Sequence, residues 1–225
     1  MEKKELPKSE GDFKPKSGIS EKISGLSGKA FGLLKFILGV CLLSFVYSSS
    51  IAFWNEFGLI DKKLQNNFWL GVVSFLAIYL FLWEPGIIYS KGHKLLEVIF
   101  NFFKPLVKVA PYLLPIYTIV LFILYAILAA IIKDAWLIKY SIFLAGFTLA
   151  LHLVFSAKAI RSKKGDFLKG NYIFGFSFIY VLNISLLSFC LNLIFKEFSF
   201  VHFSNSAYSL AKDIFFAVFK QLFLR

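Results

Sequence analysis

The chain has 225 residues, 58% of them hydrophobic, with 29 Phe and a mean hydropathy of +0.73. One soluble core needs far less apolar surface, so this composition excludes an ordinary soluble domain and indicates lipid as the solvent. The formal net charge of +12 comes from cations that lie between long apolar runs. There they act on orientation and on anionic headgroups, and we expect no nucleic-acid binding.

The N-terminal segment, residues 1–29, is rich in Lys, Ser, Gly and Glu and has almost no large apolar residue. Such a segment cannot bury enough surface to offset its chain entropy, so we predict a basic, disordered cytoplasmic tail. The apolar run from Phe31 to Trp54 contains one charge, Lys35, and is long enough to cross the ~30 Å hydrocarbon layer. We interpret this run as a signal anchor, and the weaker alternative is a cleaved signal peptide.

A second apolar run extends from Phe68 to Trp83 and is interrupted at Glu84-Pro85-Gly86. Proline lacks an amide N–H and restricts the residue before it, so a helix is expected to break or kink here. The pattern from Ile87 to Phe103 predicts another helix. One narrow polar stripe recurs on it at spacings of three and four residues, formed by Lys94, Glu97, Asn101, Lys104 and Lys108.

Three more apolar runs are long enough to span a membrane. They are Tyr112–Ile132, Trp136–Phe155 and Tyr172–Phe195. The final segment, Ser204 to Leu224, carries its polar residues largely on one side. It predicts an amphipathic helix in the membrane interface, with Ser204 or Asn205 as its N-cap.

The predicted fold is therefore an all-α polytopic membrane protein with about five transmembrane helices plus amphipathic interfacial helices. Its transmembrane domain covers residues 30–198, and the C-terminal amphipathic helix covers residues 199–225. Segments on the side of the N-terminus hold 16 Lys and Arg, against 8 on the other side. Because cytoplasmic loops carry the excess of these residues, the N-terminus is predicted inside. A helix over residues 87–103 that reinserted would reverse everything after it.

Polar groups at membrane depth are costly and are the first candidates for function. In the five-span arrangement several of them lie toward the cytoplasmic side and could converge. The candidates are Glu84, His93, Glu97, His152 and Asn183, and the loop with Asp166 lies on the same side.

Three segments resemble small bacterial integral-membrane metallopeptidases similar to site-2 proteases. Tyr89–Val98 resembles their Y-x-x-G-H-E-L-T-H-A segment, Ala110–Thr118 resembles A-P-Y-F-x-P-L-Y-T, and Gly146–Leu153 resembles G-F-T-x-A-F-H-L. Asp166 and Asn183 fall where that pattern carries Asp and Asn. The likeness covers roughly residues 68 to 195, and it implies a helical membrane scaffold built around a zinc site.

The zinc motif of that family is degenerate in this chain. In H-E-x-x-H the two histidines bind zinc and the glutamate acts as general base on the metal-bound water. Here His93 keeps the first ligand position, Lys94 occupies the base position and Glu97 occupies the second ligand position. A protonated lysine cannot accept a proton and repels the metal, so we expect no hydrolysis by the family mechanism.

Two interpretations of these residues remain open. His93 and Glu97 could hold zinc with His152 or Asp166 as a third ligand, because a carboxylate is an acceptable zinc donor. We favour the simpler interpretation, in which His93, Lys94 and Glu97 are the solvated stripe of an interfacial helix and His152 bonds across helices. We accordingly predict no catalytic residue and no cofactor.

The predicted function is that of a non-catalytic scaffold or binding protein in the inner, cytoplasmic membrane of a bacterium, in contact with lipid and with other membrane proteins. One alternative is a transporter or channel component, suggested by the broken segments at Glu84-Pro85-Gly86 and at Pro111 and Pro115. The others are a membrane assembly protein without a small-molecule site and an active zinc peptidase with an atypical site.

Overall fold

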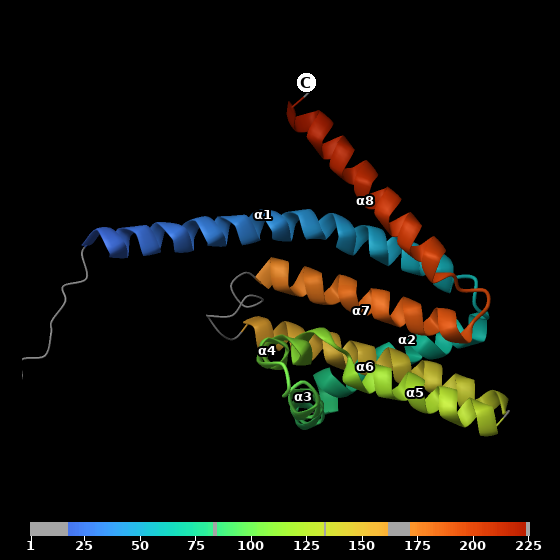
Figure 1. Ribbon diagram of the computed structural model, residues 1–225. Coiled ribbons are helices and arrows are strands. Elements are labelled where there is room, and N and C mark those ends of the chain that lie inside the picture. The colour runs from blue at the N-terminus through green and yellow to red at the C-terminus, as the bar shows by residue number, and fades with distance from the viewer. Residues whose placement is uncertain (1–17, 83–84, 133, 162–171, 224–225) are drawn as a thin grey trace, which may run out of the picture.

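The computed structural model of the protein describes residues 18–82, 85–132, 134–161 and 172–223. Within these residues, every element of regular structure is a helix. The helices are α1 (Gly18–Phe57), α2 (Lys62–Ala77), the π-helical η1 (Ile78–Leu82), α3 (Gly86–Ile99), α4 (Lys104–Leu113), α5 (Ile116–Ile131), α6 (Ala135–Arg161), α7 (Tyr172–Ile194) and α8 (Phe200–Phe223) (Figure 1).

Four helical segments are long and apolar enough to cross a membrane, which confirms the prediction of an all-α polytopic membrane protein. They are Gly32–Phe57, Lys62–Phe81, Trp136–Arg161 and Tyr172–Ile194. The apolar helix α5 has 16 residues, which is about 24 Å at ~1.5 Å per residue. It is shorter than the predicted run because the chain breaks at Pro115, and α4 forms the first part of that run.

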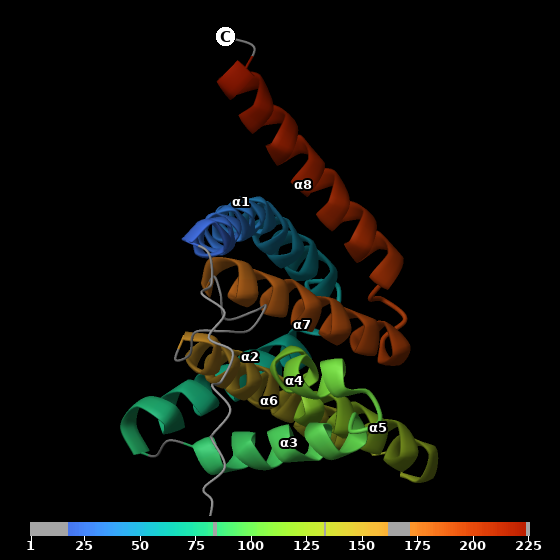
Figure 2. The same ribbon diagram turned by 60° about the vertical axis from the view of Figure 1, so that its left-hand side comes forward.

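The long helices form a bundle in which successive members run in opposite directions, as successive membrane crossings require (Figure 1). Helices α1, α5 and α7 run one way, and α2 and α6 run the other way. Helix α3 lies across this bundle and is seen nearly end-on in Figure 1 and from the side in Figure 2. It therefore adds no further crossing between α2 and α5.

Helices α2 and α6 are packed backbone to backbone at two glycines. A Cβ atom on Gly71 would lie 1.9 Å from the carbonyl oxygen of Phe143, and one on Gly146 would lie 2.2 Å from that of Phe68. Only glycine permits such an approach, which is typical of helix pairs in membranes.

The largest apolar cluster lies where α1 ends and α8 begins, and α2, α6 and α7 contribute to it. Its largest fully buried members are Phe68, Ile142, Leu187, Leu191 and Phe198.

Two predicted boundaries differ from the structure near the N-terminus. Helix α1 begins at Gly18, so residues 18–29 of the segment predicted as a disordered tail are helical. Residues 1–17 lie outside the described part. The polar residues before Phe68 are mostly helical as well, because the Asp61 carboxylate caps α2 by accepting the Lys63 N–H at 2.7 Å.

The helix predicted over residues 87–103 is interrupted, because α3 ends at Ile99 and α4 starts at Lys104. Pro105 lies in the first turn of α4, and the residue before a proline disfavours helical geometry. The predicted polar stripe is therefore divided between two helices.

The last helix also starts earlier than predicted. Helix α8 begins at Phe200, and the Ser199 hydroxyl accepts the His202 N–H at 3.2 Å, so Ser199 takes the capping role predicted for Ser204 or Asn205. The Ser204 hydroxyl instead donates to the Phe200 carbonyl within the helix.

Candidate functional site

A broken helix forms the centre of the site. Helix α4 ends at Leu113 and α5 begins at Ile116, with Pro115, which has no amide N–H, between them. The Ile116 N–H bonds to the Leu114 carbonyl. The carbonyls of Tyr112 and Leu113, at the end of α4, are therefore left for partners from elsewhere.

Polar side chains of α6 and α7 bind these two carbonyls. His152 Nε2 lies 3.1 Å from the Tyr112 oxygen, and the Ser156 hydroxyl donates to the same oxygen at 3.2 Å. The Asn183 amide donates to the Leu113 oxygen at 3.0 Å. His152 is 5% exposed and Asn183 is fully buried. We call this group of five residues the α4 junction; its bonds satisfy backbone groups that lipid cannot.

Helix α3 closes one side of the junction through Tyr89. The Tyr89 hydroxyl lies 3.2 Å from Ser156 Oγ, and its ring stacks on Phe155. Burial raises the pKa of Tyr89 to about 12, so its hydroxyl is neutral at physiological pH. Gly92 lets α3 approach α5 closely, because a Cβ there would lie 2.7 Å from the Tyr117 ring.

His93 and Glu97 lie at the rim of the α4 junction, on the same face of α3. His93 Nδ1 is 3.2 Å from Glu97 Oε1, and the two side chains are 22% and 46% exposed. The His93 ring meets the Tyr112 ring edge-on at 5.1 Å between centroids. The Tyr89 ring lies 6.1 Å from both the His93 and the His152 rings, so the predicted candidates His93, Glu97 and His152 are close together.

Lys94, at the position of the family's general base, faces another way. Its side chain is exposed and lines a surface groove of about 520 Å³ with Ser90 and Lys91. Consecutive helical residues differ by about 100° around the axis, so Lys94 and His93 occupy different faces of α3.

The described residues contain no group of three or more His, Cys, Asp or Glu that could hold a metal ion. His93 and Glu97 offer two ligands, whereas a catalytic zinc has three protein ligands. His152 Nε2 is bonded to the Tyr112 carbonyl. Asp166, predicted as the other third ligand, and Glu84 lie outside the described part of the chain. The visible chemistry is thus a hydrogen-bonded junction with one exposed His–Glu pair.

A second His–Glu pair, which the sequence analysis missed, lies where α1 meets α8. The Glu56 carboxylate is 3% exposed, accepts the Ser199 N–H at 3.1 Å and pairs with the His202 ring. Nearby, Asn192 Oδ1 accepts the Phe200 N–H at 2.9 Å. The carboxylate also suits the positive end of the α8 dipole. The sequence signal for this second pair is that an acidic residue, Glu56, comes just after the apolar run that ends at Trp54.

No model of a known protein family, no curated protein sequence and no solved structure matches the chain. The resemblance to site-2-protease-like metallopeptidases therefore rests on its three short segments and stays a prediction. What stands without it is a polytopic helical membrane protein whose His152 and Asn183 bind the end of a broken helix.

Proposed function

We propose that the protein is a non-catalytic integral membrane protein that acts as a scaffold and binds other membrane proteins. The observation that supports this proposal best is the bonding of His152, the histidine of the third family-like segment. Its Nε2 atom is 3.1 Å from the Tyr112 carbonyl, at the point where Pro115 interrupts the helix. A structural hydrogen bond of this kind explains why a histidine is buried here without a catalytic role.

The neighbouring residues support the same proposal. Hydrolysis by a zinc-bound water needs three protein ligands and a base that can accept a proton. In this chain the base position is a lysine, Lys94, whose side chain is exposed and lines a surface groove. His93 has the Glu97 carboxylate as a partner within its own helix.

Metal analysis beside a cleavage assay tests the non-catalytic half of the proposal. The full-length protein, His93→Ala and Glu97→Ala are purified and assayed for zinc and for cleavage of a model transmembrane substrate. His202→Ala is the matched control, because it removes a histidine of the other His–Glu pair. We expect no stoichiometric zinc and no cleavage in any of the four proteins.

One zinc per chain that is lost in His93→Ala and Glu97→Ala but kept in His202→Ala would overturn the proposal. So would zinc-dependent cleavage that disappears in His93→Ala. The first result would restore the family's zinc site, and the second would establish an active peptidase with an atypical site.

Site-specific photocrosslinking in native membranes tests the binding half. A photoreactive side chain at Phe102, which is 83% exposed, reports on neighbours of the turn between α3 and α4. The same group at Phe75, which is fully buried, is the control. We expect a discrete protein adduct from position 102 and none from position 75. Labelling of lipid alone at position 102 and at other exposed apolar positions would count against a binding role.

We further propose that the N-terminus and α3 lie on the cytoplasmic side of a bacterial inner membrane. The excess of 16 Lys and Arg over 8 supports this orientation, and α3 lies across the bundle without a further crossing. In a chain whose Cys41 and Cys190 are replaced, an impermeant thiol reagent should label a cysteine at Gly58 in whole cells and spare one at Lys91. The reverse pattern would reverse the orientation.

A further inference from the structure

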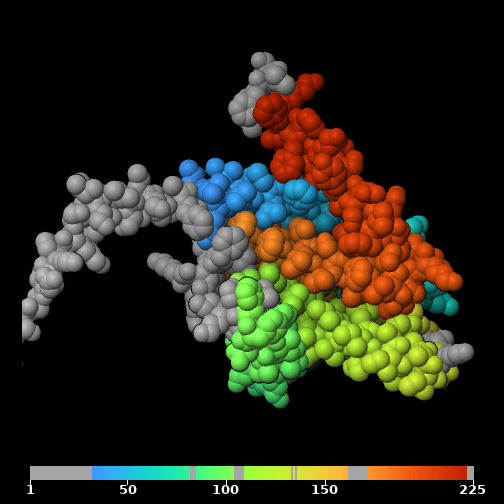
Figure 3. Space-filling view, in the orientation of Figure 1, coloured from blue at the N-terminus to red at the C-terminus, as the bar shows by residue number. Residues whose placement is uncertain are grey.

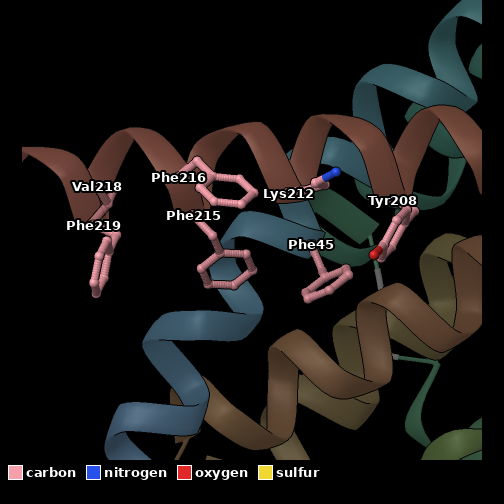
Figure 4. Close-up of a pocket in the computed structure, with 7 residues that line it drawn as sticks. All are labelled: Phe45, Tyr208, Lys212, Phe215, Phe216, Val218 and Phe219. Atoms are coloured by element: carbon pink, nitrogen blue, oxygen red, sulfur yellow. The ribbon is translucent and has the colours of Figure 1, made fainter.

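Helices α1 and α8 meet at one end and diverge toward the other (Figures 1 and 2), and a groove lies between them. In the space-filling view α8 rises away from the surface formed by α1 (Figure 3). The groove has a volume of about 600 Å³. Its lining includes Phe45 of α1 and Tyr208, Lys212, Phe215, Phe216 and Phe219 of α8 (Figure 4). We call it the α1–α8 groove.

The floor of the groove is aromatic. The rings of Phe45 on α1 and Phe215 on α8 lie 5.9 Å apart, and most of the Phe216 side chain is exposed. Phe45 belongs to the Gly32–Phe57 segment, which is long and apolar enough to cross the membrane. The groove therefore opens toward hydrocarbon, which fills apolar space of this kind with acyl chains.

The size of the groove favours a lipid chain over a protein helix. Small-ligand sites have volumes of about 300–1,000 Å³, and the groove lies in that range. A membrane-spanning helix about 10 Å across and ~30 Å long occupies on the order of 2,000 Å³. The groove is therefore too small to enclose such a helix, whereas it can take in an acyl chain.

Lys212 supplies the chemistry that selects among lipids. Its ammonium group lies 5.8 Å from the centre of the Phe216 ring, beside the apolar lining (Figure 4). Within the described residues no carboxylate forms an ion pair with Lys212. A cation next to hydrocarbon is costly unless an anion accompanies it. The phosphate of a lipid whose acyl chain occupies the groove would meet that need.

We propose that the α1–α8 groove is a binding site for an anionic phospholipid, with an acyl chain against Phe45 and Phe215 and the headgroup phosphate on Lys212. Zwitterionic lipids carry a compensating cation in the same headgroup, so the site prefers lipids with net negative charge. The inference does not depend on the absence of catalysis and would hold for an active peptidase too.

The test measures lipids retained by the full-length protein in vesicles of phosphatidylcholine with increasing phosphatidylglycerol. The variants are Lys212→Gln, Lys212→Arg and, as matched control, Lys220→Gln. Lys220 is exposed on the same helix and does not line the groove. We expect about fivefold weaker retention of phosphatidylglycerol in Lys212→Gln, the factor that corresponds to ~1 kcal/mol per cation at an anionic lipid surface. Lys212→Arg and Lys220→Gln should retain it as the unmodified protein does.

Three outcomes would overturn the proposal. Equal losses in Lys212→Gln and Lys220→Gln would indicate diffuse attraction of lipid to α8. Equal retention of phosphatidylcholine and phosphatidylglycerol by the unmodified protein would show that the groove has no preference for anionic headgroups. A photoreactive group at Phe216 that joins two copies of the chain would assign the groove to a second copy.

Discussion

The protein contains two histidine–glutamate pairs that have opposite relations to the fold. His93 and Glu97 lie one turn apart on α3, and both remain in part exposed. Glu56 and His202 lie on α1 and α8, 146 positions apart, and the carboxylate is almost completely buried. The first pair is formed within one helix, whereas the second fastens the start of α8 to the end of α1.

The difference teaches that the more suggestive pair is the less important one for the fold. His93 and Glu97 stand out in the sequence because they occupy the ligand positions of a known motif. Glu56 attracts no such notice, yet it accepts a backbone N–H of the chain entering α8, at the end where α1 and α8 meet. Four predictions can break or sharpen this contrast, and we take them from the largest expected effect to the smallest.

Glu56→Ala should lower the free energy of unfolding by about 2–3 kcal/mol, because a buried charge-assisted hydrogen bond and an anion at a helix N-terminus are lost together. Unfolding in detergent with increasing denaturant measures the loss. Hydrogen exchange should also rise over the first turns of α8. His202→Ala, which removes the partner that is 71% exposed, should cost less than about 1 kcal/mol. Equal losses of unfolding free energy in the two variants would mean that the exposed His202 contributes as much to the α1–α8 contact as the buried Glu56.

His152→Phe and Ser156→Ala should be more than additive. Each single variant removes one of the two side chains that contact the Tyr112 carbonyl, and the double variant removes both. We expect a coupling of about 1–2 kcal/mol in a double-mutant cycle of unfolding free energies. Additive losses would mean that the two side chains do not share this carbonyl and that the His152 contact with it does not stabilise the α4 junction.

Much of the bundle could be predicted because apolar runs of spanning length carry their own signal. The break at Pro115 is also a local property, since proline cannot donate a backbone hydrogen bond. The break between α3 and α4 at Pro105 is also a local property. The prediction missed it because the polar stripe keeps helical spacing across the break. Predicting α4 from the proline would have separated Lys94 and Glu97 from the rest of that stripe.

The partners of the site residues depended on distant parts of the chain. The sequence places Asn183 at membrane depth, but its bond to the Leu113 carbonyl exists only because α7 packs beside the end of α4. The pairing of Glu56 with Ser199 and His202 depends in the same way on how α8 returns along α1. Spacing within a helix predicts pairs such as His93 and Glu97, and no comparable rule reaches across helices.

Tyr89 links the α3 pair to the α4 junction and gives the junction a dependence on alkaline pH. Its pKa is raised to about 12 by burial, so the folded state keeps the phenol neutral after the unfolded chain begins to ionise near pH 10. The stabilisation is complete below pH 10 and is lost as pH rises toward 12. Relative to Tyr89→Phe, the unmodified protein should lose about 1 kcal/mol between pH 10 and 11. A constant difference would mean that water reaches the hydroxyl.

Glu97→Gln should have the smallest effect. Exposed pairs at i and i+4 contribute about 0.2–0.5 kcal/mol, and the glutamine amide can still accept a hydrogen bond from a neutral His93. The unfolding free energy should therefore change by less than about 0.5 kcal/mol, with Glu56→Gln, assayed beside it, costing several times more. A Glu97→Gln cost near that of Glu56→Gln would make the α3 pair a structural anchor as well. A negligible cost on stability combined with loss of bound zinc would show instead that Glu97 serves a metal rather than the fold.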